Sequence, residues 1–218
     1  MILFQPGNKT NKFMMRTIFS DQISDFSSIH LDDVELISIA RPDFHIIEEC
    51  SLQFLQTRKA LKLQWEQDVE DDSYIQSALS ESMPTTLRSM LINQINESGK
   101  MLGDLLGCKK VGVRLATLRS PMCPRFHVDN IACRLLITLC GKGTQWIPNN
   151  SVNWKILSDR NNDSLPVRDE SAIREFKVGH WSLLKGGSWN NNFDGVVHRS
   201  PDTSDARLLL SLDPIFEY

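Results

Sequence analysis

The sequence lacks the features that would mark a nucleic-acid-binding or a membrane protein. Lys and Arg number 24 against 27 Asp and Glu, which gives a formal net charge of -3 and no basic run to attract phosphate backbones. No apolar stretch approaches the length of a membrane span, and the run Met1-Ile2-Leu3-Phe4 is too short for a signal peptide. We therefore expect a cytoplasmic protein that has neither nucleic acid nor membrane as a partner.

Cysteine is scarce as well. The five cysteines are odd in number and lack the dense spacing of a secreted disulfide scaffold, so we expect reduced thiols at Cys50, Cys108, Cys123, Cys133 and Cys140. The 218 residues suffice for one domain with a substantial core and leave little room for a second complete one.

The first half of the chain, residues 1–109, is predicted to be mostly helical. Apolar residues at helical spacing predict one helix that begins at Asp43, a suitable N-cap, and ends at about Trp65. The acidic residues 66–72 then indicate a solvated break. Pro84 predicts the first turn of a second helix, which Gly107 would end. Alternation over residues 34–39 predicts a strand.

From residue 110 onward the pattern is that of strands. Residues 111–118, 133–139, 177–184 and 207–213 are rich in β-formers and are separated by turn residues, with a long polar excursion over 149–170. The turn spacing is typical of a jelly roll. We therefore predict an α+β fold in which residues 110–218 form a cupin-like jelly roll and the mostly helical region 1–109 packs on it as part of the same compact unit.

Three residues of the second half carry the chemistry: His127, Asp129 and His198. Two imidazoles and one carboxylate are the ligands of the facial triad that holds non-haem Fe(II) and leaves coordination positions open. Residues two apart on a strand point to the same face, so His127 and Asp129 can converge on one ion. The sequence therefore predicts a catalytic metal site, to which His198 would come from another strand.

Two other interpretations of these residues remain open. In the first, His127 caps a turn, Asp129 accepts a backbone N–H before Asn130, and His198 forms only local hydrogen bonds. In the second, Cys123 and Cys133 join the histidines in a zinc site. The second lacks a Cys-x2-Cys pair, and an unligated Cys133 in an apolar strand agrees better with the pattern.

Arg207 begins the last predicted strand. Alternation places it on one face with Leu209 and Ser211. If that face lines the barrel, the guanidinium is buried and needs a carboxylate, which a ligand such as 2-oxoglutarate supplies. A strand-start arginine is otherwise a surface residue or an ion-pair partner, here of Asp202 or Asp205. Arg114 and Arg134, on other predicted strands, are weaker candidates for the same role.

The order His-x-Asp, distal His and later Arg resembles the double-stranded β-helix of the Fe(II)/2-oxoglutarate oxygenases, over about residues 110–215. The resemblance implies that His127, Asp129 and His198 bind Fe(II), with Zn, Ni or Mn as substitutes, and that Arg207 holds the distal carboxylate of 2-oxoglutarate as co-substrate. It also implies hydroxylation or demethylation as the reaction.

Longer segments look like the bacterial family filed as domain of unknown function 1826. They are Cys123-Pro124-Arg125-Phe126-His127-Val128-Asp129, Gly141-x-Gly143-Thr144-x-Trp146, and Leu184-Lys185-Gly186 followed by Val197-His198-Arg199-Ser200-Pro201. Our interpretation is an Fe(II)/2-oxoglutarate-dependent dioxygenase. The alternatives are a non-catalytic cupin-like protein that binds metal or a small molecule at the same site, and a helix-capped interaction module whose histidines are structural. No motif indicates the substrate or the oligomeric state.

Overall fold

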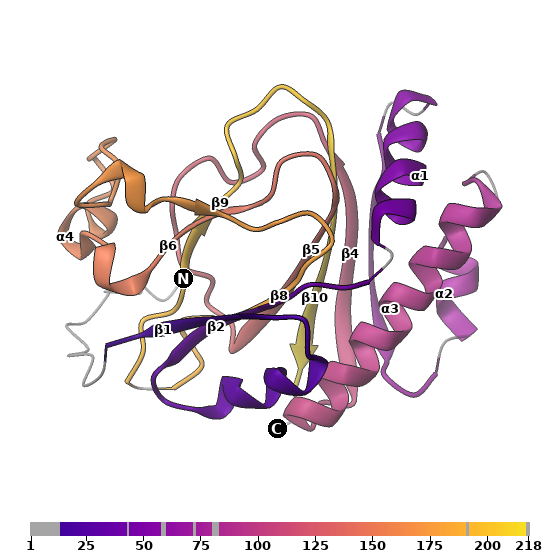
Figure 1. Ribbon diagram of the computed structural model, residues 1–218, viewed down its shortest axis with the longest axis horizontal. Coiled ribbons are helices and arrows are strands. Elements are labelled where there is room, and N and C mark those ends of the chain that lie inside the picture. Colours follow the sequence, from indigo (N-terminus) through magenta and orange to yellow (C-terminus); the bar gives the residue numbers. More distant parts are fainter. Residues whose placement is uncertain are drawn as a thin grey trace.

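The computed structural model describes residues 14–42, 44–57, 60–71, 73–79, 83–190 and 192–216, which form two β-sheets and several helices (Figure 1). The larger sheet has the order β1 (Arg16–Ser20), β2 (Val34–Ile39), β8 (Trp181–Lys185), β5 (Cys133–Cys140), β10 (Arg207–Ile215), β4 (Lys110–Leu118), β3 (Lys62–Asp68). The smaller sheet has the order β7 (Arg174–Glu175), β6 (Gln145–Ile147), β9 (Val197–Arg199). Neighbouring strands are antiparallel except β1 and β2, which are parallel.

Helices cover the outer face of the larger sheet because that face is apolar. Helices α1 (Phe44–Thr57) and α3 (Thr85–Leu106) pack on β5 and β10, while α2 (Ser73–Ala78) and the 3-10 helix η1 (Ile23–His30) contact β3 and β2 (Figure 1). On β10, Leu208, Leu210 and Leu212 are fully buried in this layer, as the alternation predicts. Each contributes about 1.5–3 kcal/mol through burial.

The inner face of the larger sheet shares a second apolar core with the smaller sheet. This core includes Leu136, Leu184, Leu209, Trp146 and Phe176. Arg207 and Ser211 are also buried, and by alternation they lie on the same side of β10 as Leu209. The strand therefore presents Arg207 to the space between the sheets, the condition on which its predicted role depends.

The N-terminal region corrects one part of the predicted fold. It supplies β1, β2 and β3 to the larger sheet, so the sheet is not confined to residues 110–218 and the region is not only helical. Trp65, predicted to end the first helix, lies in β3. Its burial alternates with exposed neighbours because β3 pairs antiparallel with β4 along its whole length. Residues 66–68 of the predicted break belong to the same strand, and Asp43 lies outside the described residues.

The second predicted helix is found in the structure, whereas one predicted strand is shorter than expected. Helix α3 follows Pro84 and ends at Gly107, whose φ of 71° is the left-handed conformation that favours glycine. No helix within the described ranges is long and apolar enough to cross a bilayer. Strand β8 is shorter than predicted, since Gly179 has a φ of 79° and a Cβ there would lie 2.4 Å from the Phe44 ring.

The polar excursion between β6 and β7 contains short elements of its own: η2 (Asn149–Ser151), α4 (Trp154–Ser158) and η3 (Glu170–Ala172). A bridge between Val152 and Val167 closes it into a loop. Its apolar side chains pack against Phe126 and Val197, beside the smaller sheet and away from the long helices (Figure 1). The excursion thus lies over the segment that carries the metal motif.

Candidate metal centre

Backbone pairing brings the two distant histidines together. His127, before β5, and His198, on β9, exchange two hydrogen bonds, with N···O distances of 3.0 and 2.9 Å. Their ring centroids are 4.6 Å apart. Asp129 Oδ1 lies 3.5 Å from His127 Nε2, and Asp129 Oδ2 lies 3.3 Å from His198 Nε2. One ligand atom from each of the three residues falls within 4.8 Å of the others, so the predicted convergence is present.

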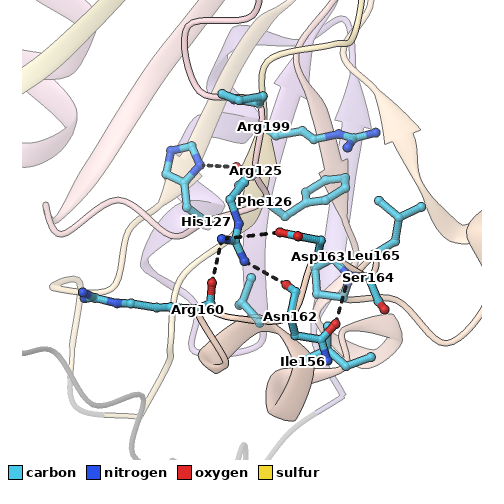
Figure 2. A pocket seen from close by; sticks show the side chains of 13 residues that line it. Arg125, Phe126, His127, Ile156, Arg160, Asn162, Asp163, Ser164, Leu165 and Arg199 are labelled. Carbon is cyan, nitrogen blue, oxygen red and sulfur yellow. Dashed lines mark hydrogen bonds and ion pairs between the residues drawn. The ribbon is translucent and has the colours of Figure 1, made fainter.

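The hydrogen bonds of the imidazoles fix which nitrogen faces the carboxylate. His127 Nδ1 is 3.0 Å from the carbonyl of Arg125, and His198 Nδ1 is 3.1 Å from that of Val196 (Figure 2 shows the first). A carbonyl only accepts, so each Nδ1 carries the proton and each Nε2 of a neutral ring presents a lone pair to Asp129. Lone pairs and carboxylate oxygens repel one another unless a proton or a cation lies between them. The donor set therefore fits a metal ion.

The charges around Asp129 keep it ready to bind a cation. Burial opposes its ionisation, but the hydrogen bonds that His127 and His198 donate from Nε2 when they are protonated, together with the charge of Arg134, lower the pKa of its carboxyl well below the ordinary range. For His127, burial opposes protonation, yet its bonds to Asp129 and to the Arg125 carbonyl outweigh this and raise its pKa. Without metal, a proton would take the place between His127 and Asp129.

Arg134, which the sequence presented only as a weaker candidate for anchoring the co-substrate, contacts the candidate metal ligand Asp129 instead. From β5, its Nη1 donates to Asp129 Oδ2 at 2.6 Å. Its Nε and Nη2 donate to both oxygens of Asp213 on β10, at 2.7 and 2.6 Å. A bidentate pair of this kind fixes the guanidinium plane. Asp213 was not singled out from the sequence. The alternation that places Arg207 and Ser211 on one face of the strand also places Asp213 there, so the same alternation could have identified it.

Arg207 lies elsewhere on the inner face of β10 and is 2% exposed. Its Nη1 donates to the carbonyl of Lys142 at 3.0 Å and its Nη2 to Thr144 Oγ1 at 3.1 Å. Its Nε has no hydrogen-bond partner among the described residues, so the guanidinium donates only to neutral oxygens there. Burial lowers its pKa to about 10, against the opposing charge of Glu175. Pairing with Asp202 or Asp205 is not found.

The structure also bears on the two alternative interpretations, in which the histidines are structural or share a zinc site with cysteines. Both histidines do form local hydrogen bonds through Nδ1, but no backbone N–H in the described ranges donates to the Asp129 side chain. The described residues that could jointly hold a metal include no cysteine. Burial raises the pKa of Cys133 to about 12 and that of Cys140 to about 11, as expected for inert core thiols. Cys123 is exposed.

Two cavities open beside His127, with volumes of about 350 and 190 Å³. Both are lined by Phe126, His127, Leu157 and Arg160, so they flank the histidine on the side covered by the excursion (Figure 2). Arg207 lines neither cavity. His127 is also the more exposed of the two histidines, with 33% of its side chain accessible against 6% for His198. A molecule would therefore approach the centre from the His127 side.

Comparison with known proteins places the chain in a family. A family model matches residues 20–213, almost the whole described chain. The chain belongs to the family described as protein of unknown function (DUF1826). A search of curated proteins finds no matching sequence for this DUF1826 chain.

Solved structures show the fold of the DUF1826 chain. Dioxygenase for auxin oxidation 1 from Arabidopsis thaliana, in a 2-oxoglutarate complex, is 10% identical with a TM-score of 0.55, covering 94% of each chain. The rice dioxygenase for auxin oxidation is 11% identical with a TM-score of 0.53, over 92% of this chain and 83% of that one. A full-length Neurospora crassa protein solved with alpha-KG is 11% identical with a TM-score of 0.51, over 96% and 87%. The mixed α+β fold of this chain, with its large β-sheet, is thus similar to the fold of these solved structures.

Proposed function

We propose that this protein is an Fe(II)/2-oxoglutarate-dependent oxygenase of the hydroxylase or demethylase type. One observation carries the proposal: two imidazole Nε2 atoms and the carboxylate of Asp129 converge within 4.8 Å, and a metal cation can take the place between them that a proton would otherwise fill. The fold supports it, since two of the similar structures were solved with 2-oxoglutarate or alpha-KG.

In this proposal His127, Asp129 and His198 hold Fe(II), which when bound supplies the oxygen chemistry that protein side chains lack. One turnover consumes a substrate C–H bond, O2 and 2-oxoglutarate, and yields the hydroxylated substrate, succinate and CO2. One oxygen atom of O2 enters each of the first two products. A hydroxyl placed on an N-methyl carbon leads to loss of that carbon as formaldehyde, which is the demethylase outcome.

The protein's own residues bind and orient. Arg207 would receive the distal carboxylate of 2-oxoglutarate, because its Nε is unpartnered in the described structure and its buried guanidinium donates only to neutral oxygens. Arg134 holds Oδ2 of Asp129, which leaves Oδ1 as the freer ligand atom. The inner core around Trp146 and Leu209 excludes water from the space beside Arg207.

A second function has a specific observation in its favour. Arg207 already donates to Lys142 and Thr144, and it lines neither cavity beside the metal centre. A non-catalytic cupin-like protein that binds metal or a small molecule would need no further ligand at Arg207. The two functions differ in one property, the binding of 2-oxoglutarate to the metal-loaded protein.

The discriminating experiment is an anaerobic titration of the Fe(II)-loaded protein with 2-oxoglutarate. The oxygenase should develop a weak visible charge-transfer band as the keto acid chelates the metal, and should release succinate once air is admitted. Succinate as the titrant serves as the control, since it lacks the keto group and should give no band. A protein that binds Fe(II) fully and shows neither band nor succinate release is the non-catalytic metal-binding protein.

A further inference from the structure

The larger cavity beside His127 has three walls. The segment from Pro124 to His127 forms one, helix α4 and the loop that follows it to Pro166 form the second, and Arg199 of β9 forms the third (Figure 2). Its volume of about 350 Å³ lies at the small end of the range for small-molecule pockets, about 300–1,000 Å³. The size favours a small molecule over an extended polymer.

The lining carries more positive charge than the rest of the surface. Arg125, Arg160 and Arg199 line the cavity, and Asp163 is the one acidic residue among its lining residues. The Asp163 side chain is 95% exposed and that of Arg125 is 56% exposed, so water screens both charges and the ion pair between them. The chain as a whole has a formal charge of -3, which makes this a local reversal of sign. Such a hollow concentrates anions.

Two of the arginines are held in place by hydrogen bonds to neutral acceptors. Arg199 Nε donates to Gln145 Oε1 at 2.8 Å, and its guanidinium lies 4.4 Å above the centre of the Phe126 ring. Its Nη atoms donate to no group in the described part of the chain and can receive an anion. Arg125 donates to the carbonyls of Arg160 and Asn162, and its Nη1 also forms a long, exposed ion pair with Asp163 Oδ1 at 3.9 Å (Figure 2). Arg199 is therefore the better placed of the two to receive an anion.

Besides the polar Asn162 and Ser164, the remaining lining is mostly apolar. It consists of Pro124, Phe126, Ile156, Leu157, Leu165 and Pro166. His127 completes the wall and connects the cavity to the metal centre. A ligand that satisfies both kinds of lining has an anionic end for Arg199 and an apolar body that reaches toward His127.

We propose that this cavity binds a small organic anion with an apolar body, a carboxylate or a phosphate, and that this anion is the substrate of the metal centre. Its identification as a substrate rests on the proposed oxygenase function, whereas its binding does not. Arg199 determines the specificity for charge, and the apolar body is positioned against Phe126 and Leu157, next to the metal ligand His127.

Binding is tested with matched probes by 19F NMR at low salt, on the full chain treated with a chelator so that no probe can ligate metal. The probes are 4-fluorobenzoate, 4-fluorophenyl phosphate, neutral 4-fluorobenzamide and cationic 4-fluorobenzylamine. An anion should bind about tenfold more tightly than the amide, as one charge-assisted hydrogen-bonded contact provides. The better of the two anions identifies the anionic group. Equal affinity for anion and amide, or no binding of either anion, overturns the proposal.

Variants locate the site. Arg199→Gln should reduce anion affinity about tenfold and leave amide affinity nearly unchanged, because only the charged contact is removed. Arg168→Gln is the matched control, an exposed arginine of the same excursion that does not line the cavity, and it should have no effect. Circular dichroism checks that both variants fold. Anion binding that survives Arg199→Gln unchanged places the anion elsewhere and contradicts the proposal.

The two proposals fail in distinguishable ways. Anion binding in the cavity together with no 2-oxoglutarate turnover leaves the binding site standing and removes the oxygenase. Turnover stimulated by neutral or cationic compounds and not by anions leaves the oxygenase standing and overturns the inference about its substrate.

Discussion

The two ends of β10 carry charges of opposite sign in different surroundings. At one end, Asp213 accepts hydrogen bonds from Nε and Nη2 of Arg134, and Nη1 of Arg134 donates to Asp129. Each charged group of this network therefore contacts a group of opposite charge. At the other end Arg207 is more deeply buried and contacts only neutral oxygens. The first end is complete within the protein, whereas the second has capacity for an external carboxylate. Substitutions should therefore separate metal binding from co-substrate binding.

The largest effect is expected at Asp129. Asp129→Asn removes the ligand charge and should lower metal affinity by more than about 100-fold, beyond the 10–100-fold typical of outer partners. Titration calorimetry with Mn(II) or Co(II) measures this. Asp163→Asn is the matched control, an exposed acid of the cavity rim that should leave metal affinity unchanged. Equal loss in both variants would mean a general electrostatic effect and no ligand role for Asp129.

Arg207→Ala should weaken the binding of 2-oxoglutarate and leave metal binding nearly unchanged. Loss of a buried charge-assisted pair is expected to cost 2-oxoglutarate binding about 2–5 kcal/mol, with metal affinity nearly unchanged. Arg207→Lys should restore part of the binding, because an ammonium keeps the charge and lacks the planar fork. Titration of the charge-transfer band gives both affinities. A parallel loss of metal and keto acid would show that the two ends are not independent.

Arg134→Gln should have an intermediate effect on the metal. Releasing Asp129 from its outer partner is expected to reduce metal affinity about 10–100-fold, with little direct effect on 2-oxoglutarate. Arg134→Lys should recover only part of the metal affinity, because an ammonium lacks the planar fork that forms two parallel hydrogen bonds to Asp213. Asp213→Asn should also reduce metal affinity, but by less than Arg134→Gln does. If Arg134→Gln binds Co(II) as tightly as the parent, the network does not position Asp129.

The smallest effect is that of pH. A protonated His127 cannot coordinate a metal ion. Because its pKa is raised above the ordinary value of about 6.5, protons begin to compete with the metal at a pH above 6.5. Metal affinity should fall with falling pH through that range, by at most about tenfold per pH unit for one proton. The same shift stabilises the metal-free fold below about pH 6.5 and is lost as pH rises through the raised pKa. Calorimetry in buffers of different ionisation enthalpy should detect proton release on binding at pH 7, and its absence would contradict this.

The sequence was sufficient for the residues whose role depends on short-range geometry. His127 and Asp129 could be predicted because of their spacing, and the inward direction of Arg207 could be predicted because Leu208, Leu210 and Leu212 define the opposite face. The approach of His198 needed only a jelly-roll strand order, which the turn spacing indicated. The period of two along a strand accounts for Arg207, whereas His127 and Asp129 converge just before β5 in a segment where only His127 forms an isolated bridge.

Other features depend on packing that one sequence does not contain. Arg134 looked like any strand arginine, because its role needs Asp213 on a neighbouring strand. Residues 61–65 satisfy both helical and strand spacing, and the edge of β4 decided in favour of β3. The cavity exists because the excursion folds back over Phe126, a long-range contact without a local motif.

The central claim, a single metal ion held by His127, Asp129 and His198, is tested most directly by anomalous X-ray diffraction from crystals grown anaerobically with Fe(II). The account predicts one anomalous peak per chain at about 2.0–2.2 Å from the two Nε2 atoms and a carboxylate oxygen of Asp129, distances ordinary for nitrogen and oxygen ligands of such ions. Crystals grown with Fe(II) that show no peak there, or that show the iron bound at Cys123 instead, would contradict it.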